Sequence, residues 1–184
     1  KDAPASPVRG LMLDVGRNYM SVPFLKSVVR RLSHYKINVL HLHLSDDPGW
    51  RVEVNKYPEL TVETSFWPTR QPGKFYTQED IKSICDFCDS LNIRVIPEID
   101  MPGHSAAFRK AIGKDMQTPE GMQVLKEALD EIIPLFKDSL FHIGSDEVHF
   151  KMKEFMPEMI RYVRSKGKQV VVWYPGYAPD SNAV

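Results

Sequence analysis

The sequence has little of several features that would indicate particular classes of protein. It contains only two cysteines among its 184 residues, which is too few for a disulfide framework and leaves the cellular compartment open. Its 24 basic and 24 acidic residues balance, so no overall field favours nucleic acid or an anionic membrane. No apolar run approaches the ~20 residues that span a bilayer. No glycine-rich loop carries the lysine of a nucleotide phosphate site. We therefore expect no nucleic-acid partner and no membrane span.

The composition that remains is typical of one globular domain. Hydrophobic residues make up 42% of the chain and charged residues 26%, and this length is sufficient to bury a core. Residues 1–8 are predicted to be a linker or N-terminal extension, because they lack the apolar centre of a signal peptide. Residues 9–184 are predicted to form the domain.

Five short apolar runs predict strands, at residues 10–15, 38–44, 94–99, 140–144 and 169–173. Helical patterns separate them, and this alternation implies parallel strands joined by right-handed crossovers. Both an open doubly wound sheet and a barrel satisfy such a pattern. A complete barrel has eight strand–helix units and needs about 250 residues, whereas only about four and a half units are present.

Local signals delimit the four expected helices. The first has apolar residues at three-four spacing from Phe24 to Leu32. Thr77 opens the second as part of a capping-box analogue, and Thr118 caps the third ahead of a proline. The fourth is expected from about residue 152, with Gly167 at its C-terminal stop.

The two cysteines, Cys85 and Cys88, form a C-x-x-C sequence that could indicate redox chemistry. They lie within the second helical pattern rather than at a turn between strand and helix, and their spacing places both thiols on the buried stripe. We therefore expect them to be packing residues of the core.

Polar residues follow the first four predicted strands. In a parallel α/β sheet the carboxyl ends of the strands share one rim, where active sites are built. Helix capping explains one or two of these residues, but not acids, an arginine and a histidine on one rim. The residues are Asp14, Arg17 and Asn18; Ser45, Asp46 and Asp47; Glu98, Asp100 and His104; and Asp146 and Glu147.

The fourth of these clusters is the most informative. Residues 141–148 (FHIGSDEV) read as a buried strand that leads into the adjacent acids Asp146 and Glu147. Two neighbouring carboxylates at this position are unfavourable unless they are solvated, paired with another group or engaged with a ligand. The alternative is a helix N-terminus, where acids cap free N–H groups. The connection between residues 45 and 76 also spans about thirty residues and carries aromatics, which favours a functional loop.

Two chemistries are compatible with the rim. His41 and His43 lie on one face of a strand near Asp46, which allows a metal-dependent hydrolase, although strand histidines are often core residues. Glycoside hydrolysis needs a carboxylic acid with aromatic and hydrogen-bonding groups. The usual enzymes set two carboxyls about 5–9.5 Å apart across the sugar, which consecutive residues cannot easily do. A nucleophile supplied by the substrate removes that difficulty.

Four segments in order resemble the motifs of glycoside hydrolase family 20, the β-N-acetylhexosaminidases. They are residues 9–17 (RGLMLDVGR), 41–51 (HLHLSDDPGWR), 97–104 (PEIDMPGH) and 142–147 (HIGSDE). The resemblance implies a (β/α)8 TIM barrel, of which about five strands and four helices are expected here. It also implies an exo-acting hydrolase that removes terminal N-acetylglucosamine or N-acetylgalactosamine with retention by substrate-assisted catalysis. No cofactor and no metal are implied.

The resemblance also assigns roles to residues. Glu147 would be the general acid/base, and Asp146 would hold the acetamido N–H and stabilise the oxazolinium-like intermediate. Asp46 and His104 would support the acid from behind. Two residues would bind substrate: Arg17, at the outer hydroxyls, and Trp173, as a wall of the acetamido pocket.

The chain departs from the family pattern in two ways. Ser145 stands where the family often has a second glycine or alanine, and we expect this change to be tolerated. The barrel strands six to eight of the family are not expected within these residues. The alternative function is therefore a catalytically silent fragment or carbohydrate-binding remnant, with self-association through incomplete barrel edges. Hydrolysis of extracellular glycans would fit an exported protein, but the sequence specifies no compartment.

Overall fold

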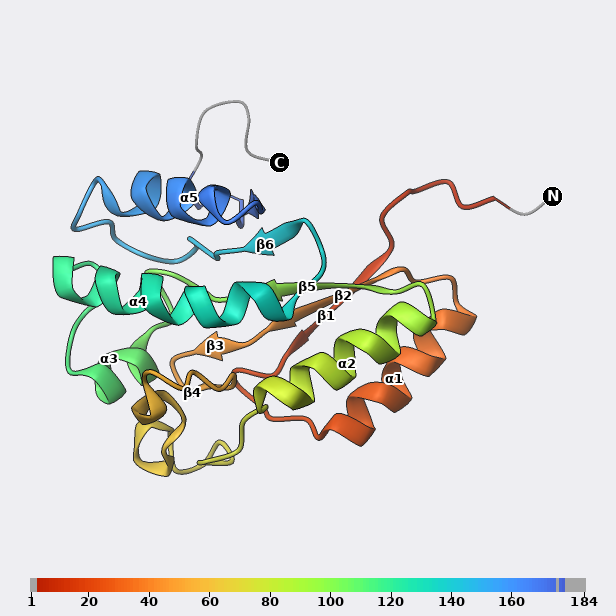
Figure 1. The fold of residues 1–184 in the computed structure, drawn as a ribbon, viewed down its shortest axis with the longest axis horizontal. Helices are drawn as coiled ribbons and strands as arrows, with labels where there is room; N and C mark the ends of the chain where they lie inside the picture. Colours follow the sequence, from red (N-terminus) through yellow and green to blue (C-terminus); the bar gives the residue numbers. More distant parts are fainter. Residues whose placement is uncertain (1–2, 175, 178–184) are drawn as a thin grey trace.

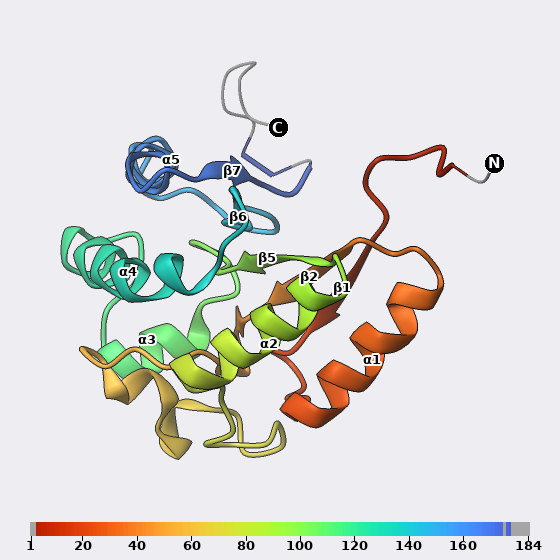
Figure 2. The ribbon, with the colours of Figure 1, turned by 45° about the vertical axis from the view of Figure 1, so that its right-hand side comes forward.

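Five parallel strands form one curved sheet, and the helices follow one another along its side (Figures 1 and 2). The computed structural model describes residues 3–174, 176 and 177. The order of the strands in the sheet, β1-β2-β5-β6-β7, is their order along the chain. A doubly wound sheet reverses its order at a switch point, so this order is that of a barrel. The strands are β1 (Gly10–Asp14), β2 (Val39–His43), β5 (Arg94–Glu98), β6 (Leu140–His142) and β7 (Gln169–Val171).

Each observed strand lies within a predicted apolar run and ends one or two residues before it. The parallel register pairs Asp14 with His43, His43 with Glu98, and Glu98 with His142. Residues in register lie side by side across neighbouring strands. The sheet therefore presents one continuous row of acids and histidines near its carboxyl ends.

The four predicted helices are present, with the predicted caps. Thr77 and Asp80 form a reciprocal capping box, and the Thr118 side chain accepts a hydrogen bond from Gly121 N. None of the helices in the described residues combines the length and apolar character needed to cross a membrane. The helices are α1 (Val22–His34), α2 (Gln78–Ser90), α4 (Pro119–Ile132) and α5 (Phe155–Ser165), the last beginning three residues later than predicted.

One further helix, α3 (Ala106–Ile112), was not predicted. Its seven residues make only about two turns, too few for an apolar period to stand out from chance. It leads away from the carboxyl end of β5 and packs against the loop that follows β2. It therefore contributes to the rim rather than to the outer layer.

The core lies between the sheet and the helices. Leu25 and Val29 of α1 are fully buried, and Cys85 and Cys88 of α2 are buried as free thiols. Burial raises the pKa of both cysteine thiols to about 12, so they are inert packing residues, as predicted. Each large apolar side chain buried in this way stabilises the fold by roughly 1.5–3 kcal/mol relative to exposure.

The long connection after β2 is ordered around a buried arginine. It contains β3 (Ser45–Asp46), β4 (Gly49–Trp50) and two 3-10 turns, η1 (Pro58–Thr61) and η2 (Glu63–Ser65). The Arg51 guanidinium is fully buried and donates to five backbone carbonyls, those of Val15, Gly16, Arg70, Gln71 and Lys74. It thereby ties the connection to the loop that follows β1.

Candidate active site

The rim begins with Arg17, just past the carboxyl end of β1. Its Nη1 donates to Asp14 Oδ2 at 2.6 Å, and its Nη2 lies 2.9 Å from Asp46 Oδ2. The backbone N–H of Arg17 also donates to Asp14, which fixes the base of the side chain. The guanidinium is held by two acids and stays 42% exposed, so it can still bind a ligand from the solvent side.

His104 links the buried and exposed acids of the rim. Its Nδ1 lies 3.8 Å from Asp46 Oδ1, and its Nε2 lies 3.3 Å from Glu147 Oε2 and 3.8 Å from Asp146 Oδ2. Asp46 is 2% exposed, whereas the Glu147 side chain is 76% exposed. An imidazole between a buried and an exposed carboxylate can hold the exposed acid in place and exchange protons with it.

The loop that carries Asp146 and Glu147 has an unusual backbone. Gly144, Ser145 and Glu147 all have positive φ, at 65°, 84° and 49°. Positive φ is unfavourable for residues with a Cβ, and such strain clusters at functional sites. A Cβ on Gly144 would lie 1.7 Å from Asp100 Oδ1, so only glycine fits there. Asp100 Oδ1 in turn accepts from Ser145 N at 3.3 Å.

Asp100 is a buried acid behind the adjacent pair. It is 1% exposed, and its backbone N–H donates to Ser45 Oγ. Burial, followed by the negative charges of Glu98 and Asp146, raises the pKa of Asp100 to about 7. Near neutral pH this carboxyl is therefore partly protonated, which relieves repulsion from Asp146.

Beneath the rim, Glu98 is surrounded by histidines. Its Oε2 lies 2.8 Å from His41 Nε2 and 3.0 Å from His43 Nδ1, and its Oε1 lies 3.3 Å from His142 Nδ1. Burial alone would raise the pKa of Glu98, but the histidines outweigh it and hold the pKa well below its usual range. Glu98 is thus a buried carboxylate that organises the interior of the sheet.

Trp173 belongs to this interior cluster. Its Nε1 donates to Glu98 Oε1 at 2.7 Å, and its ring lies 4.6 Å from that of His142 and 5.5 Å from that of His41, between centroids. The carboxylate therefore fixes the plane of the indole. Trp173 is partly buried, and it contacts the histidine–glutamate cluster rather than the acids of the rim.

Several groups of these side chains have the spacing of metal ligands. His41, Glu98 and His142 each offer one ligand atom within 4.8 Å of the others, and so do Asp100, His104 and Asp146. Imidazole with one carboxylate is a donor set that suits zinc. However, Glu98 Oε1 already accepts a hydrogen bond from Trp173, and Glu98 Oε2 already lies at ion-pair distance from His41 and His43. These contacts within the protein account for the first group.

The structure brings five of the six predicted site residues into contact: Arg17, Asp46, His104, Asp146 and Glu147. The side chain of the sixth, Trp173, contacts the Glu98 cluster, and its backbone N–H donates to Gly144 O in the loop that carries the adjacent acids. The two residues that sequence reasoning did not single out are Glu98 and Asp100, although both were placed on the rim. The signal that could have found them is their position beside His104 in residues 97–104, one on each side of Ile99.

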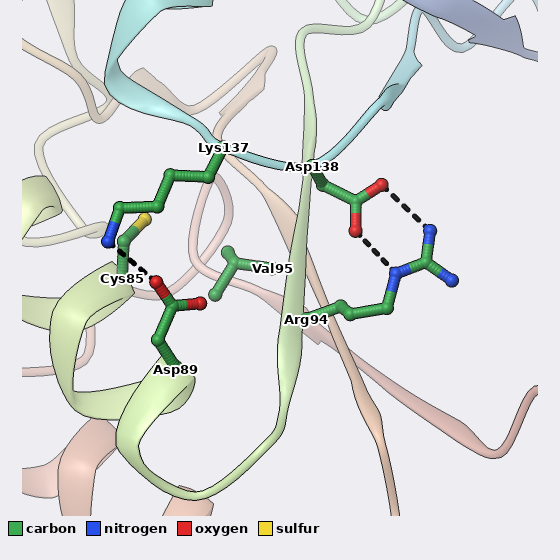
Figure 3. Close-up of a pocket in the computed structure, with 6 residues that line it drawn as sticks. All are labelled: Cys85, Asp89, Arg94, Val95, Lys137 and Asp138. Atoms are coloured by element: carbon green, nitrogen blue, oxygen red, sulfur yellow. Dashed lines mark hydrogen bonds and ion pairs between the residues drawn. The ribbon is translucent and has the colours of Figure 1, made fainter.

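A separate cavity of about 190 Å³ lies at the other end of the sheet, near the start of β5 (Figure 3). Figure 3 shows its charged side chains turned toward one another: Arg94 pairs with Asp138 at 2.5 Å, and Lys137 with Asp89 at 2.6 Å. The four charged side chains of this cavity are therefore paired with one another.

Known proteins are similar to this chain in both sequence and fold. The model of glycosyl hydrolase family 20, catalytic domain, matches residues 7–121 and 114–177. A beta-hexosaminidase from Vibrio furnissii is 33% identical over 230 residues, covering 94% of this chain and 38% of that protein. A beta-N-acetylhexosaminidase from Cellulomonas fimi is 34% identical over 199 residues, covering 94% of this chain and 40% of that protein. The chain thus spans about two fifths of these curated relatives.

A solved structure gives the same result for the fold. The beta-N-acetylhexosaminidase from Bacteroides fragilis superposes with a TM-score of 0.86 at 30% identity, covering 98% of this chain and 44% of that one. The prediction of a (β/α)8 barrel, represented here by five strands with their helices, is confirmed.

Proposed function

Because this chain belongs to glycosyl hydrolase family 20, we propose that the protein is an exo-β-N-acetylhexosaminidase. It removes terminal N-acetylglucosamine or N-acetylgalactosamine from glycans with retention of configuration. The observation that carries the proposal is the position of His104, with one ring nitrogen toward the buried Asp46 and the other toward Asp146 and Glu147. Such an arrangement is suited to a general acid, Glu147, that is positioned by an imidazole and lies beside a second carboxylate.

The reaction uses the acetamido group of the substrate as the nucleophile. Glu147 donates its proton to the glycosidic oxygen as the bond from that oxygen to C1 breaks. The acetamido oxygen forms a new bond to C1 and gives a cyclic oxazolinium intermediate. Asp146 accepts a hydrogen bond from the acetamido N–H and stabilises the positive charge of the intermediate. Water then attacks C1 as the bond from C1 to the acetamido oxygen breaks, gives its proton to Glu147, and releases the sugar with its original configuration.

Other residues orient the substrate and the acid. Arg17, anchored by Asp14 and Asp46, presents its exposed donors to the hydroxyls of the terminal sugar. His104 holds Glu147, with Asp46 behind it. Trp173, fixed by Glu98, offers an apolar face to the acetamido methyl group.

The test uses a complete family 20 domain that carries this sequence. A sugar leaving group needs the acid more than a nitrophenyl group does, so a disaccharide of N-acetylglucosamine is the substrate. We expect Glu147→Gln to lower kcat by about 10²–10⁴, and Asp146→Asn to slow formation of the cyclic intermediate. Exposed Glu154 provides the matched control, Glu154→Gln. A thiazoline mimic of the intermediate should inhibit the parent enzyme. Full activity in both variants would contradict the proposal.

Two other functions give different results in the same assays. A carbohydrate-binding remnant would bind N-acetylglucosamine without turnover, in the 184-residue chain and in the completed domain alike. A metal-dependent hydrolase using His41 and His43 would lose activity on exhaustive chelation. For the proposed chemistry, we expect chelation to leave turnover unchanged.

A further inference from the structure

Ser145, the residue before the adjacent acids, combines two unfavourable features. Its φ of 84° is a conformation that favours glycine. The residue is also only 1% exposed, so its hydroxyl is removed from solvent. A buried hydroxyl is unfavourable unless it has a hydrogen-bond partner. Backbone strain of this kind persists where the surrounding structure holds it and clusters at functional sites. The serine side chain should therefore have a use at this position.

The partner of the hydroxyl lies in the segment that follows β7, which comprises Trp173, Tyr174, Gly176 and Tyr177 in the described residues. The Ser145 hydroxyl accepts a hydrogen bond from Tyr177 N at 3.2 Å. The Tyr177 ring also packs edge-on against that of Phe150, with their centroids 5.9 Å apart. Ser145 and Phe150 both belong to the connection after β6. Tyr177 is therefore joined to that connection by both its backbone and its ring.

The same two stretches of chain are in close contact elsewhere. Trp173 N donates to Gly144 O at 2.9 Å, and Gly176 N donates back to Trp173 O at 2.9 Å. A Cβ on Gly176 would lie 2.5 Å from Ser145 O and 2.7 Å from Ser145 Oγ, so only glycine allows this approach. The segment after β7 is thus tied at both ends, by a backbone bond at Trp173 and by the Ser145 hydroxyl at Tyr177.

This junction lies between two walls of the acetamido pocket. In the proposed function, the Trp173 indole contacts the acetamido methyl group and Asp146 accepts its N–H. Trp173 belongs to the segment after β7, whereas Asp146 directly follows Ser145 in the connection after β6. A longer acyl group would push these two stretches apart. The bond between Ser145 and Tyr177 resists that separation, because it must break before the segment can move away.

We propose that Ser145 is a positioning residue whose hydroxyl fixes the width of the acetamido pocket and so restricts the enzyme to short N-acyl groups. The inference rests on the proposed function, because the pocket is defined by substrate-assisted catalysis. It goes further in assigning a determinant of acyl-group selectivity to a side chain that contacts neither the sugar nor the acids. Glycine at this position would relieve the backbone but would leave Tyr177 N without this acceptor.

The experiment compares two substrates of a complete family 20 domain that carries this sequence: the nitrophenyl β-glucosaminides with an N-acetyl and an N-propionyl group. In the parent enzyme the propionyl group must break the bond to Tyr177, whereas in Ser145→Ala and Ser145→Gly that bond is already absent. We therefore expect the ratio of kcat/KM, N-propionyl over N-acetyl, to rise about threefold to tenfold in both variants, the worth of one neutral hydrogen bond.

The matched control is Ser165→Ala. Ser165 is exposed near the end of α5, and its hydroxyl donates to Tyr162 O within that helix, so the ratio should not change. Ser145→Gly keeps the experiment informative if Ser145→Ala folds poorly, because glycine suits the positive φ.

The outcomes separate the two proposals. A parent enzyme that hydrolyses neither substrate would overturn the proposed function, and the role of Ser145 with it. Normal hydrolysis of the N-acetyl substrate with an unchanged ratio in both variants would overturn the role of Ser145 alone. A rise in Ser145→Ala without one in Ser145→Gly would also overturn it, because the cause would then be a shift of the strained backbone rather than loss of the hydroxyl.

Discussion

The Nε2 of His43 lies 2.8 Å from Oδ2 of Asp46, and this contact joins the interior of the sheet to its rim. The other ring nitrogen, Nδ1, lies 3.0 Å from Glu98. His43 therefore faces one carboxylate on each side while being only 3% exposed. Burial alone would lower the pKa of His43, but Asp46 and Glu98 outweigh it and raise the pKa to about 10. The ring is thus a buried cation at neutral pH.

This cation should make stability depend on pH. An unfolded histidine titrates near pH 6.5, so above that pH the folded state holds a proton that the unfolded chain has lost. The stabilisation is complete below about pH 6.5 and is lost as the pH rises toward about 10. We expect His43→Gln to lower the free energy of unfolding by roughly 3–5 kcal/mol at pH 6.5 and to remove most of the decline above it. Urea unfolding at pH 6.5, 8 and 9.5 measures both effects.

The control is His34, an exposed histidine at the end of α1. His34→Gln should leave both the free energy of unfolding and its pH dependence within about 0.5 kcal/mol of the parent values. An undiminished decline above pH 6.5 in His43→Gln would show that another group causes it.

Gly144 should be irreplaceable for a steric reason. Its φ is 65°, and a Cβ there would lie 1.7 Å from the Asp100 carboxylate. Gly113 has a similar φ of 72°, with no atom within 4 Å of its Cβ position. Gly113→Ala should therefore cost only about 1 kcal/mol from the backbone, and Gly144→Ala several kcal/mol more, because Asp100 must move. Thermal unfolding of both variants gives the difference. Equal losses of stability in the two variants would mean that the Asp100 side chain moves aside at little cost.

Arg51 should determine whether the long connection stays ordered. Replacing it with lysine keeps the charge, but a single ammonium cannot reach the five carbonyls that the guanidinium satisfies. Buried acceptors left without donors cost about 1–3 kcal/mol each, so we expect Arg51→Lys to destabilise the chain by at least about 3 kcal/mol. Limited proteolysis should then cut between residues 52 and 75.

The same loop supplies the control for that experiment. Arg70 donates its Nη1 to Asn18 at the surface, so Arg70→Lys should change stability by less than about 0.5 kcal/mol. Proteolysis that is equally fast in both variants would indicate that the loop opens independently of Arg51.

Strand periodicity and cap residues were sufficient to predict the sheet and four of its helices. Apolar runs bounded by polar clusters identify strands well, and Thr77 and Thr118 begin their helices as their side chains require. The choice between an open sheet and a barrel could not be predicted from these runs alone, because a doubly wound sheet and a barrel are built from the same strand–helix units. Strand order, a long-range property, distinguished them.

The site was predictable as a set of residues but not as a set of contacts. The carboxyl ends of parallel strands share a rim, which brought Arg17, Asp46 and His104 together without any knowledge of distances. The role of Glu98 was not predictable, because its histidine partners come from two other strands and Trp173 follows a third, so the cluster exists only once the sheet has formed. Ser145 was expected to replace a small residue harmlessly. Its φ of 84° gives the physical reason that glycine is favoured at this position.

The contact between His104 and Glu147 should control how the enzyme responds to alkali. The alkaline limb of the pH–rate profile reports loss of the proton that the acid must donate. His104 Nε2 lies 3.3 Å from Glu147, with Asp46, Asp146 and Arg17 as its other charged neighbours. In His104→Ala the carboxylate form of Glu147 loses a donor and becomes less favourable. The alkaline limb should therefore move to higher pH in a complete family 20 domain that carries this sequence. Asp46→Asn should move it in the same direction by less, because Asp46 acts through the imidazole, whereas His34→Ala should not move it. A limb that stays in place in His104→Ala, with kcat lowered at every pH, would make His104 a packing residue and leave Glu147 to be positioned by the strained backbone of its own loop.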